Sequence, residues 1–322
     1  MSTSTLTAKK KARAISYKGE RGVRNSVVIA LIVFNLLLLV IPVGIAFVGS
    51  FHNWNPLNGT FDPVGLENYK RMFQDPRLGT SIVNTLIFSA VAITARVILG
   101  LALAIAIFTK VTRFTTFFRA LFYMPTVTPL VAVAYVWKIM YDPQVGAINT
   151  FFGLDINWLF DTKFALPAIM LMTIWKDFGY AVILFLAGLY SLPEDVMEAA
   201  AVDGASPWKR FWHVTLPLLR PMTIFVIITS LIAYLQAFIQ VMVLTKGGPG
   251  TSTYILSYLI YDEAFVKYNF GYASTIAFGL LVVTASLTAL SFAVSGMNLK
   301  PRHRRSKSVA SVAALNEGAS NA

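Results

Sequence analysis

The chain has 322 residues, of which 56% are hydrophobic and 13% are charged, with a formal net charge of +12. Because a soluble domain of this size usually carries about a quarter charged residues, most of the surface is expected to face lipid rather than water. Cysteine is absent, which excludes disulfides and thiolate chemistry. The three histidines, His52, His213 and His303, share no ligand spacing, so no metal site is expected.

Six apolar runs are long enough to cross a bilayer, for which a helix needs roughly 20 apolar residues. The first run is too long for the core of a signal peptide and no small-residue cleavage site follows it, so it is expected to remain as a span. Pro and Gly inside several runs are compatible with bundle helices, because neighbouring helices satisfy the freed backbone groups. An all-α polytopic membrane domain over 26–300 is therefore expected, with spans at about 26–49, 82–108, 117–140, 165–190, 222–244 and 272–296.

The basic residues flank the apolar runs, as a topology signal requires, so binding to nucleic acid is not expected. Most of them lie in the tails at 1–25 and 301–322 or in the loops after the second and fourth spans. Six spans place both tails on one side, and the positive-inside rule assigns that side to the cytoplasm. Both tails are expected to be flexible. The segment 191–221, between spans four and five, is expected on the same cytoplasmic side.

Segment 191–221 begins with the pattern of a short capped helix. Ser191 and Glu194 have the spacing of a capping box, in which Ser191 accepts a hydrogen bond from the third helical N–H and Glu194 reaches back. The helix is expected to run to about Asp203. Gly204, which follows, suits a left-handed C-cap.

A second short helix is expected after Gly204, with Ser206 as its N-cap and Pro207 in its first position. This helix is expected to end near Leu216-Pro217. Its aromatic residues are Trp208, Phe211 and Trp212. Aromatic side chains at this density in a polar segment usually mark an interface.

Within this segment, Glu198-Ala199-Ala200, Gly204, Val214 and Leu216-Pro217 form a spaced pattern. The pattern resembles the EAA signature of the inner-membrane permeases of binding-protein-dependent ABC transporters, in which isoleucine stands where this chain has Val214. The resemblance implies that the two short helices dock in a cleft of a separate ATPase subunit. The coupling residues that it implies are Glu198, Ala199, Ala200, Asp203, Gly204, Val214, Leu216 and Pro217.

The chain itself has no Walker-type Gly-rich loop with lysine and no nucleophile elbow. ATP and Mg²⁺ are therefore expected on the partner ATPase, and this chain is expected to hold no cofactor and to be no enzyme. The alternative is that segment 191–221 is an ordinary amphipathic loop. That alternative would not explain why the spacing of the signature, the expected side of the membrane and the position between spans four and five all agree with the family pattern.

Three further motifs, Gly65–Tyr69, Asn84-Thr85 and Thr245–Gly250, resemble the carbohydrate-uptake branch of the same family. They are similar to the first permease of maltose, lactose and glycerol-3-phosphate systems, over about 25–300. The resemblance implies a type I ABC importer permease fold and a di- or oligosaccharide as cargo. The partners that it implies are a second homologous permease, a pair of ATPase subunits and an extracytoplasmic solute-binding protein, assembled in a lipid membrane.

Polar side chains inside spans are energetically expensive and often mark a transport path. Thr173, Asp177 and Tyr180 share one face of span four, and Ser230 and Tyr234 are four residues apart in span five. These five residues are candidates for lining a sugar path near the middle of the bilayer. Packing between helices is the alternative role.

Arg96 in span two and Asp177 in span four lie at similar depth by residue count. This placement predicts an ion pair inside the bundle, with exposure to a water-filled cavity as the alternative. Lys176, Gln236 and Gln240 are further polar residues of spans four and five.

Two other classes of membrane protein fit less well. A secondary transporter needs intramembrane carboxylates and usually two related halves, but Asp177 is the one convincing intramembrane acid and no repeat is visible. A membrane enzyme needs clustered His, Asp or Glu, which the sequence does not show. Among ABC importers, glycerol-3-phosphate is the serious alternative cargo, although phosphate would favour several Arg or Lys along the path.

Overall fold

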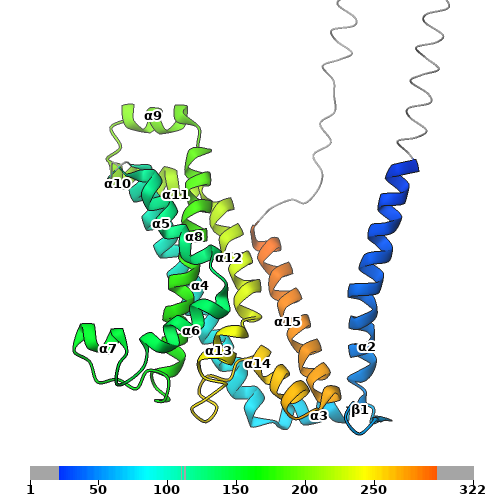
Figure 1. Cartoon of the computed structure of the whole chain (residues 1–322). Helices are drawn as coiled ribbons and strands as arrows, with labels where there is room; N and C mark the ends of the chain where they lie inside the picture. Colours follow the sequence, from blue (N-terminus) through cyan, green and yellow to red (C-terminus); the bar gives the residue numbers. More distant parts are fainter. Residues whose placement is uncertain (1–21, 110, 112–113, 296–322) are drawn as a thin grey trace, which may run out of the picture.

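Runs of Leu, Ile, Val and Ala form the long helices of the chain, because a helix satisfies its own backbone groups where no water is available. The computed structural model describes residues 22–109, 111 and 114–295, which form a helical bundle with one small β-hairpin (Figure 1). Its labelled helices and π-helical turns are η1 (Leu36–Val40), α2 (Ile41–Gly49), α3 (Glu67–Gln74), α4 (Pro76–Phe108), α5 (Thr115–Val127), α6 (Leu130–Met140), α7 (Ala147–Phe152), α8 (Ala165–Tyr190), α9 (Glu194–Val202), α10 (Pro207–Arg210), η2 (Phe211–Thr215), α11 (Leu216–Leu218), α12 (Arg220–Leu235), α13 (Ile239–Leu244), α14 (Leu256–Tyr261), η3 (Asp262–Val266) and α15 (Phe270–Ser295).

Four described helices are long and apolar enough to cross a membrane, and they are Gly22–Gly49, Pro76–Phe108, Ala165–Tyr190 and Phe270–Ala293. Two bent pairs, α5 with α6 and the α10–α11 region with α12, pass the same test when each pair is taken as one span. The described part of the chain therefore has up to six spans. α8 matches the expected span 165–190, whereas α4 begins earlier than the expected 82–108, at Pro76.

The first helix, Gly22–Gly49, begins inside the tail expected at 1–25. The rest of that tail and the tail expected at 301–322 lie outside the described residues. None of the most apolar part of this helix is buried, and the helix stands apart from the bundle along most of its length (Figure 1). It meets the bundle at its C-terminal end, where the ring of Phe47 lies 5.0 Å from the ring of Phe278 in α15.

A β-hairpin that the sequence pattern does not indicate lies after the first helix. Its strands, β1 (His52–Asn55) and β2 (Thr60–Pro63), pair antiparallel. The turn between them is held by Asn55, whose Oδ1 accepts a hydrogen bond from the backbone N–H of Leu57 at 2.9 Å. The hairpin lies at the opposite end of the molecule from α9 (Figure 1). These two ends are called the β1 end and the α9 end below.

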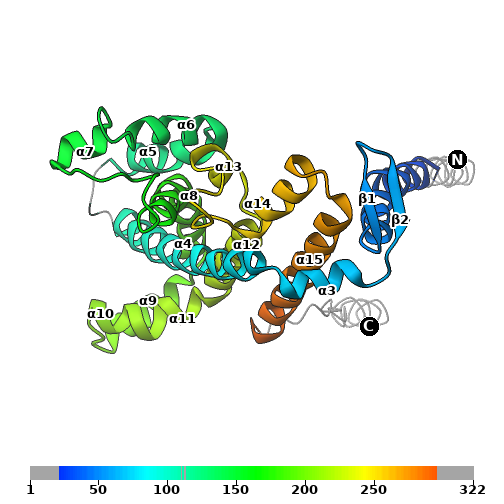
Figure 2. The ribbon, with the colours of Figure 1, turned by 90° about the horizontal axis from the view of Figure 1, so that it is seen from below.

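α4, α8 and α12 form the centre of the bundle, and α5 packs on α8 (Figure 2). Small residues allow the backbones to approach closely, as is common between membrane helices. A methyl group at Gly100 in α4 would lie 2.6 Å from the Cβ of Ala181 in α8. Gly179 in α8 lies directly against the backbone carbonyl of Phe122 in α5.

The expected third span, 117–140, is not one helix. α5 and α6 meet at an angle of 96° across Thr128 and Pro129. Pro129 has no backbone N–H and disfavours helical backbone at the residue before it, and Thr128 is accordingly extended, with φ −72° and ψ 136°. Pro125, by contrast, lies inside α5 without ending it.

The expected fifth span, 222–244, is broken as well. α12 ends at Leu235 and α13 begins at Ile239, although neither Pro nor Gly lies between them. At the break, the ring of Phe238 packs 4.9 Å from the ring of Tyr261 at the end of α14. Tertiary packing rather than a local helix breaker accompanies this interruption.

The turn expected at Thr245–Gly250 is present, with positive φ at Gly247 and Gly250 and a cis peptide bond before Pro249. Asn84 of α4 holds the chain that follows, because its Nδ2 donates to the backbone carbonyls of residues 251, 252 and 254 at 2.9–3.3 Å. The next residue, Thr85, accepts a hydrogen bond at its hydroxyl from the N–H of Leu256 at 2.9 Å. Both residues of the Asn84-Thr85 motif therefore tie α4 to this loop.

A network of charged side chains joins α3, the start of α4 and η3 at the β1 end. Glu263 is fully buried, and its carboxylate contacts Arg77 at 2.7 Å, Lys267 at 2.8 Å and Arg71 at 3.5 Å. Arg77 also binds the carboxylate of Asp75 at 2.8 Å. Three cations thus surround one buried carboxylate, which compensates its charge.

Candidate functional site

The segment between α8 and α12 forms the α9 end of the molecule, and it is called the α9–α11 segment below (Figure 1). Its first turn lies at Gly204, where φ is +77°. The N–H of Ala205 donates to the carbonyl of Ala200 and that of Gly204 donates to Ala201, both at 3.1 Å. This is a Schellman motif, and it confirms the left-handed C-cap expected at Gly204.

The capping box expected at Ser191 and Glu194 is wrong. α9 begins at Glu194, its N-cap is Pro193, and no side chain caps it. Ser191 instead follows the last turn of α8, where its hydroxyl donates to the carbonyl of Gly188 at 2.8 Å. Because α8 continues to Tyr190, Ser191 serves the end of that helix and not the start of the next one.

The cap expected at Ser206 is confirmed, since its hydroxyl accepts from the N–H of Lys209 at 3.4 Å and Pro207 occupies the first turn of α10. The expected end near Leu216-Pro217 is confirmed to within one residue, because this helix ends at Leu218. The helix includes the π-helical turn η2 and α11, and the chain then bends by 61° into α12. At the bend, Leu219 is buried against Gly188 of α8.

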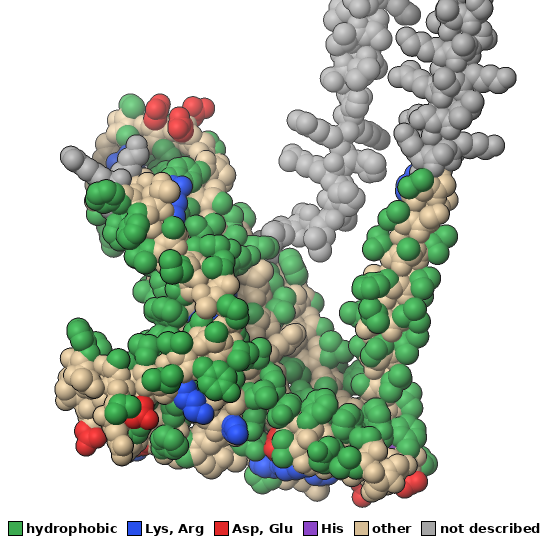
Figure 3. Space-filling view, viewed as in Figure 1, with side chains coloured by type: hydrophobic (Ala, Val, Ile, Leu, Met, Phe, Trp, Pro, Cys, Tyr) green, Lys and Arg blue, Asp and Glu red, His purple; other side chains and the backbone are tan. Residues whose placement is uncertain are grey.

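The signature residues lie on the outside of this segment. Glu198, Ala199 and Gly204 are exposed, and no residue of α9 is buried within the chain. Figure 3 shows acidic side chains gathered on the outward side of α9. Trp208 is 70% exposed and Trp212 is 47% exposed, which is unusual for tryptophan and leaves both available for contact with another molecule.

The other signature positions are distributed over the same surface. Ala200 and Val214 are partly buried, whereas Asp203 and Pro217 are exposed. Leu216 is partly buried at the start of α11. The structure thus brings the spaced residues together on one short element that is continuous with two long helices.

A second group of polar residues lies inside the bundle, where α4, α8 and α12 meet. Arg96 is 6% exposed, and its guanidinium lies over the rings of Tyr180 and Tyr234, at 5.2 and 5.8 Å from their centres. The Nε of Arg96 is buried and has no hydrogen-bond partner, whereas the buried hydroxyl of Tyr234 interacts with both Arg96 and Asp177. This arrangement holds a cation between two aromatic faces.

The direct ion pair expected between Arg96 and Asp177 is not present among the described residues, but the two charges attract each other, and the hydroxyl of Tyr234 interacts with both. Asp177 instead pairs with its neighbour Lys176, at 3.8 Å from Nζ to Oδ1. Lys176 also donates to the carbonyl of Thr126 at 3.3 Å, and the Thr126 hydroxyl donates to the carbonyl of Lys176 at 3.0 Å. These two bonds link α5 to α8. The sequence does not predict the contact between Thr126 and Lys176, because the two residues are 50 positions apart.

The remaining residues of the expected sugar path have different surroundings. Thr173 and Ser230 are fully buried, and their hydroxyls donate to the carbonyls of Ile169 and Val226 within their own helices. Their alternative role, packing between helices, fits this geometry. Gln236 is exposed at the break after α12, whereas Gln240 is buried.

Two groups in the charged network at the β1 end have pKa values that differ from their ordinary values. Burial alone raises the pKa of Asp75, but hydrogen bonds from Arg77 and Tyr272 outweigh it, so this pKa lies below 3.8. Burial alone lowers the pKa of Lys267, but its bonds to Asp262 and Glu263 place it above 10.5. Within the described residues no three His, Asp or Glu side chains are arranged to hold a metal ion.

Comparisons with known proteins agree with this architecture. The family model of the "binding-protein-dependent transport system inner membrane component" matches residues 96–297. The multiple sugar-binding transport system permease protein of Streptococcus mutans is 36% identical, over 76% of this chain and 86% of its own length. The sn-glycerol-3-phosphate transport system permease protein of Pectobacterium atrosepticum is 31% identical, over 81% and 90%.

A solved structure of a bacterial ABC transporter involved in the import of the acidic polysaccharide alginate contains a chain of the same fold. The TM-score is 0.76 at 21% identity, and the match covers 89% of this chain and 100% of the other. The type I permease fold expected from the resemblance is therefore confirmed. The chain belongs to the family of inner-membrane components of binding-protein-dependent transport systems.

Proposed function

We propose that this chain is one transmembrane subunit of an ABC importer that takes up a carbohydrate. A solute-binding protein delivers the carbohydrate, and a separate ATPase that holds ATP and Mg²⁺ docks on the α9–α11 segment. The observation that carries this proposal is the exposed signature of this segment, which follows α8 after three residues and leads into α12 through the bend at Leu219.

The α9 end faces the cytoplasm in this proposal, and the β1 end faces the extracytoplasmic side. The bias of Lys and Arg toward the tails and the α9–α11 segment supports this orientation. The chain is then a multi-pass protein of the cell membrane with both termini in the cytoplasm. The solute-binding protein would dock on the hairpin and the loops of the β1 end.

Coupling follows from the way the segment is attached. α8 holds Asp177 and Tyr180, and α12 holds Tyr234, so a displacement of the α9–α11 segment acts directly on both helices beside Arg96. The bend at Leu219 is packed against α8, which makes the two helices move together. Closure of an ATPase pair would thus reach the interior of the bundle through rigid elements.

The first helix supports a second permease subunit in the assembly. Its apolar side chains are exposed on all sides, and it contacts the rest of the described chain near its C-terminal end. A neighbouring homologous subunit, with lipid around it, would cover this surface.

A carbohydrate is favoured as cargo because one relative is named for multiple sugars and because the bundle interior holds little uncompensated charge. Asp177 contacts Lys176 and also attracts Arg96, so the polar group holds two cations around one carboxylate. The buried Nε of Arg96, which has no partner, is the observation that favours the second candidate, glycerol-3-phosphate, for which another relative is named. A single guanidinium would neutralise only part of the negative charge of a phosphate.

Uptake measurements test the function. The complete set of subunits is expressed in a strain that lacks the transporter. This strain is expected to take up labelled oligosaccharide, and uptake is expected to stop when the phosphate-binding lysine of the ATPase is replaced. Uptake that persists without a functional ATPase would contradict the ABC mechanism. Uptake of labelled sn-glycerol-3-phosphate in place of the sugar would change the cargo and leave the mechanism intact.

A substitution in the α9–α11 segment tests the coupling role. Gly204→Asp is expected to leave membrane insertion intact and to abolish transport, because a carboxylate and a strained backbone would stand at the docking surface. The matched control is Gly153→Asp, which also replaces a glycine with positive φ in open space but lies at the other end of the molecule. Normal transport by a fully assembled Gly204→Asp complex would refute the assignment.

A further inference from the structure

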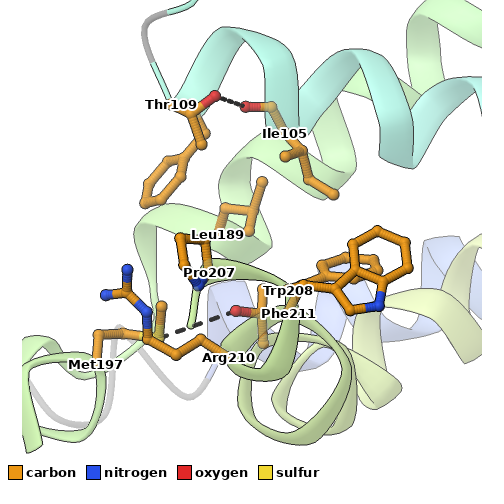
Figure 4. Close-up of a pocket in the computed structure, with 10 residues that line it drawn as sticks. Ile105, Thr109, Leu189, Met197, Pro207, Trp208, Arg210 and Phe211 are labelled. Atoms are coloured by element: carbon orange, nitrogen blue, oxygen red, sulfur yellow. Dashed lines mark hydrogen bonds between the residues drawn. The ribbon is translucent and has the colours of Figure 1, made fainter. Parts of the chain in front are cut away.

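A cavity of about 460 Å³ lies beneath the α9–α11 segment. Figure 4 shows its two walls, with Ile105 of α4 and the C-cap residue Thr109 on one side and Pro207, Trp208 and Arg210 of α10 on the other. The residues that complete the lining are Phe108, Leu189, Met197, Phe211 and Thr215. The cavity therefore separates the proposed coupling element from the C-terminal ends of α4 and α8.

Its lining is suited to a hydrocarbon chain. Apart from Arg210 and the two threonines, every lining side chain is aliphatic, aromatic or a thioether. The Thr109 hydroxyl donates to the carbonyl of Ile105 in its own helix, so it presents no free donor. Phe108, on the same wall, packs edge-to-face on Tyr190 at 5.3 Å. A rigid apolar wall of this kind gains free energy when an apolar chain replaces water.

Arg210, which lines the cavity, and Arg119, which contacts Tyr190, each have one N–H donor without an acceptor. The Nε of Arg210 is buried and has no hydrogen-bond partner, and the same is true of the Nε of Arg119. Arg119 donates to the hydroxyl of Tyr190, the residue that packs on Phe108. The site therefore combines an apolar chamber with an unsatisfied cationic donor at Arg210, which is the chemistry that a phosphate on an acyl chain would match.

The acidic residues nearby do not oppose an anion inside the cavity. Glu194, Asp195 and Glu198 are exposed, and Figure 3 shows the acidic side chains on the outward side of α9. Met197 of the same helix lines the cavity from the inner side. The charge of α9 is thus directed to the proposed ATPase surface and the apolar side to the cavity.

The position of the cavity relative to the membrane indicates where the acyl chain would come from. Ile105 and Phe108 belong to the last turns of α4, and Leu189 belongs to the last turn of α8, so the cavity lies where two spans leave the membrane. Trp208 at the rim is typical of this level. In the orientation proposed above, this is the boundary with the cytoplasmic leaflet, where anionic lipids bind basic sites next to spans.

The geometry points to a binding site for one anionic phospholipid of the cytoplasmic leaflet, with an acyl chain in the cavity and the phosphate at Arg210, which lines the cavity. The inference rests on the orientation proposed above but not on the cargo. A bound lipid fills the space between the α9–α11 segment and α4 and α8. The position of the segment, and with it coupling to the ATPase, then depends on the lipid.

Photo-crosslinking of the complete transporter in nanodiscs tests the site. The probes are phosphatidylglycerol and phosphatidylcholine that carry a diazirine near the end of one acyl chain. Phosphatidylglycerol is expected to label peptides containing residues 105–109 and 197–211. Phosphatidylcholine is expected to label them about tenfold less, because its choline cation offsets the charge of the phosphate and is repelled by the guanidinium. Equal labelling by the two lipids, or labelling confined to other surfaces of the spans, would overturn the proposal.

Variants separate the headgroup contact from the chamber. Arg210→Gln is expected to remove the preference for phosphatidylglycerol, whereas Lys209→Gln, at an exposed neighbouring cation, is expected to keep it. Met197→Trp fills the cavity and is expected to remove the crosslinks, whereas Val196→Trp, at a position 41% exposed on the same helix, is expected to leave them. Crosslinks that survive Met197→Trp, or equal effects of the two cation variants, would contradict the site. Failure of the transport test with these crosslinks intact would refute only the proposed function.

Discussion

At the scale of single residues, Gly179 sets the distance between α8 and α5. Its Cα faces the carbonyl oxygen of Phe122, so there is no space for a side chain. The close approach also brings Lys176, one turn earlier, within reach of the Thr126 carbonyl. A change at this glycine therefore affects both packing and a polar link.

Gly179→Ala is expected to destabilise the chain by about 1–3 kcal/mol, because the helices must separate to admit the methyl group. The measurement is thermal unfolding of the purified protein in detergent. Gly79→Ala, in α4, is the control, since a methyl group there meets nothing within 4 Å. Equal stability of the two variants would show that α5 moves aside without cost.

Arg96 is the second residue with a testable role. Arg96→Met retains most of the volume but removes the cation held between Tyr180 and Tyr234, and it is expected to cost about 1–2 kcal/mol of stability. If Arg96 also contacts the cargo, the concentration of sugar that gives half-maximal uptake rises in Arg96→Met and is partly restored in Arg96→Lys. A stability loss with unchanged uptake would assign Arg96 to packing alone.

At the scale of elements, Asn84 connects α4 to the loop after α13. Its single amide group donates to three carbonyls of that loop. The loop leads into α14 and η3, which hold part of the charged network. The amide thus fixes the position of elements that the chain order separates by more than a hundred residues.

Asn84→Ala is expected to lower the free energy of unfolding by about 1–3 kcal/mol, because carbonyls of residues 252 and 254 lose their donor. Limited proteolysis of the loop is the second measurement, and cleavage is expected to accelerate. Thr80→Ala serves as the control, since the Thr80 hydroxyl bonds only to the carbonyl of Pro76 in its own helix. An unchanged cleavage rate would contradict the anchoring role.

At the scale of the whole molecule, the charged network holds the β1 end together across a broad pH range. The lowered pKa of Asp75 means that its stabilisation is present above pH 3.8 and is lost as the pH falls through its folded-state pKa. The raised pKa of Lys267 means that its stabilisation is present below pH 10.5 and is lost as the pH rises through its folded-state pKa. Between these two pH limits, the contribution of Asp75 and Lys267 to the free energy of unfolding does not change with pH.

The test is thermal unfolding of the solubilised protein from about pH 4 to about pH 10. Near neutral pH, the charged network is expected to cause no loss of stability. Asp75→Asn is expected to lower stability throughout that range, because Arg77 and Tyr272 lose a charged acceptor. Asp62→Asn is the control at an exposed carboxylate of β2. A transition centred near neutral pH that Asp75→Asn removes would contradict this account.

The expected and observed elements differ where distant parts of the chain meet. The pattern of α8 predicts its bounds because an uninterrupted apolar run needs no partner to become a helix in lipid. The cap at Ser206 and the turn at Gly204 are equally local, and the structure shows both. Ser191 has the same local signal but lies at the end of α8, so the continuing helix takes its hydroxyl.

The sequence by itself determined that this is a helical membrane protein, which family it belongs to and where its exposed signature lies, because hydropathy, glycine turns and the spacing of Glu198 to Pro217 are properties of short stretches. Only the tertiary structure decided that Asp177 pairs with Lys176 and that Arg96 lies between two tyrosines. Side-chain partners inside a bundle depend on how helices rotate and approach one another, and close packing around residues such as Gly179 sets that geometry.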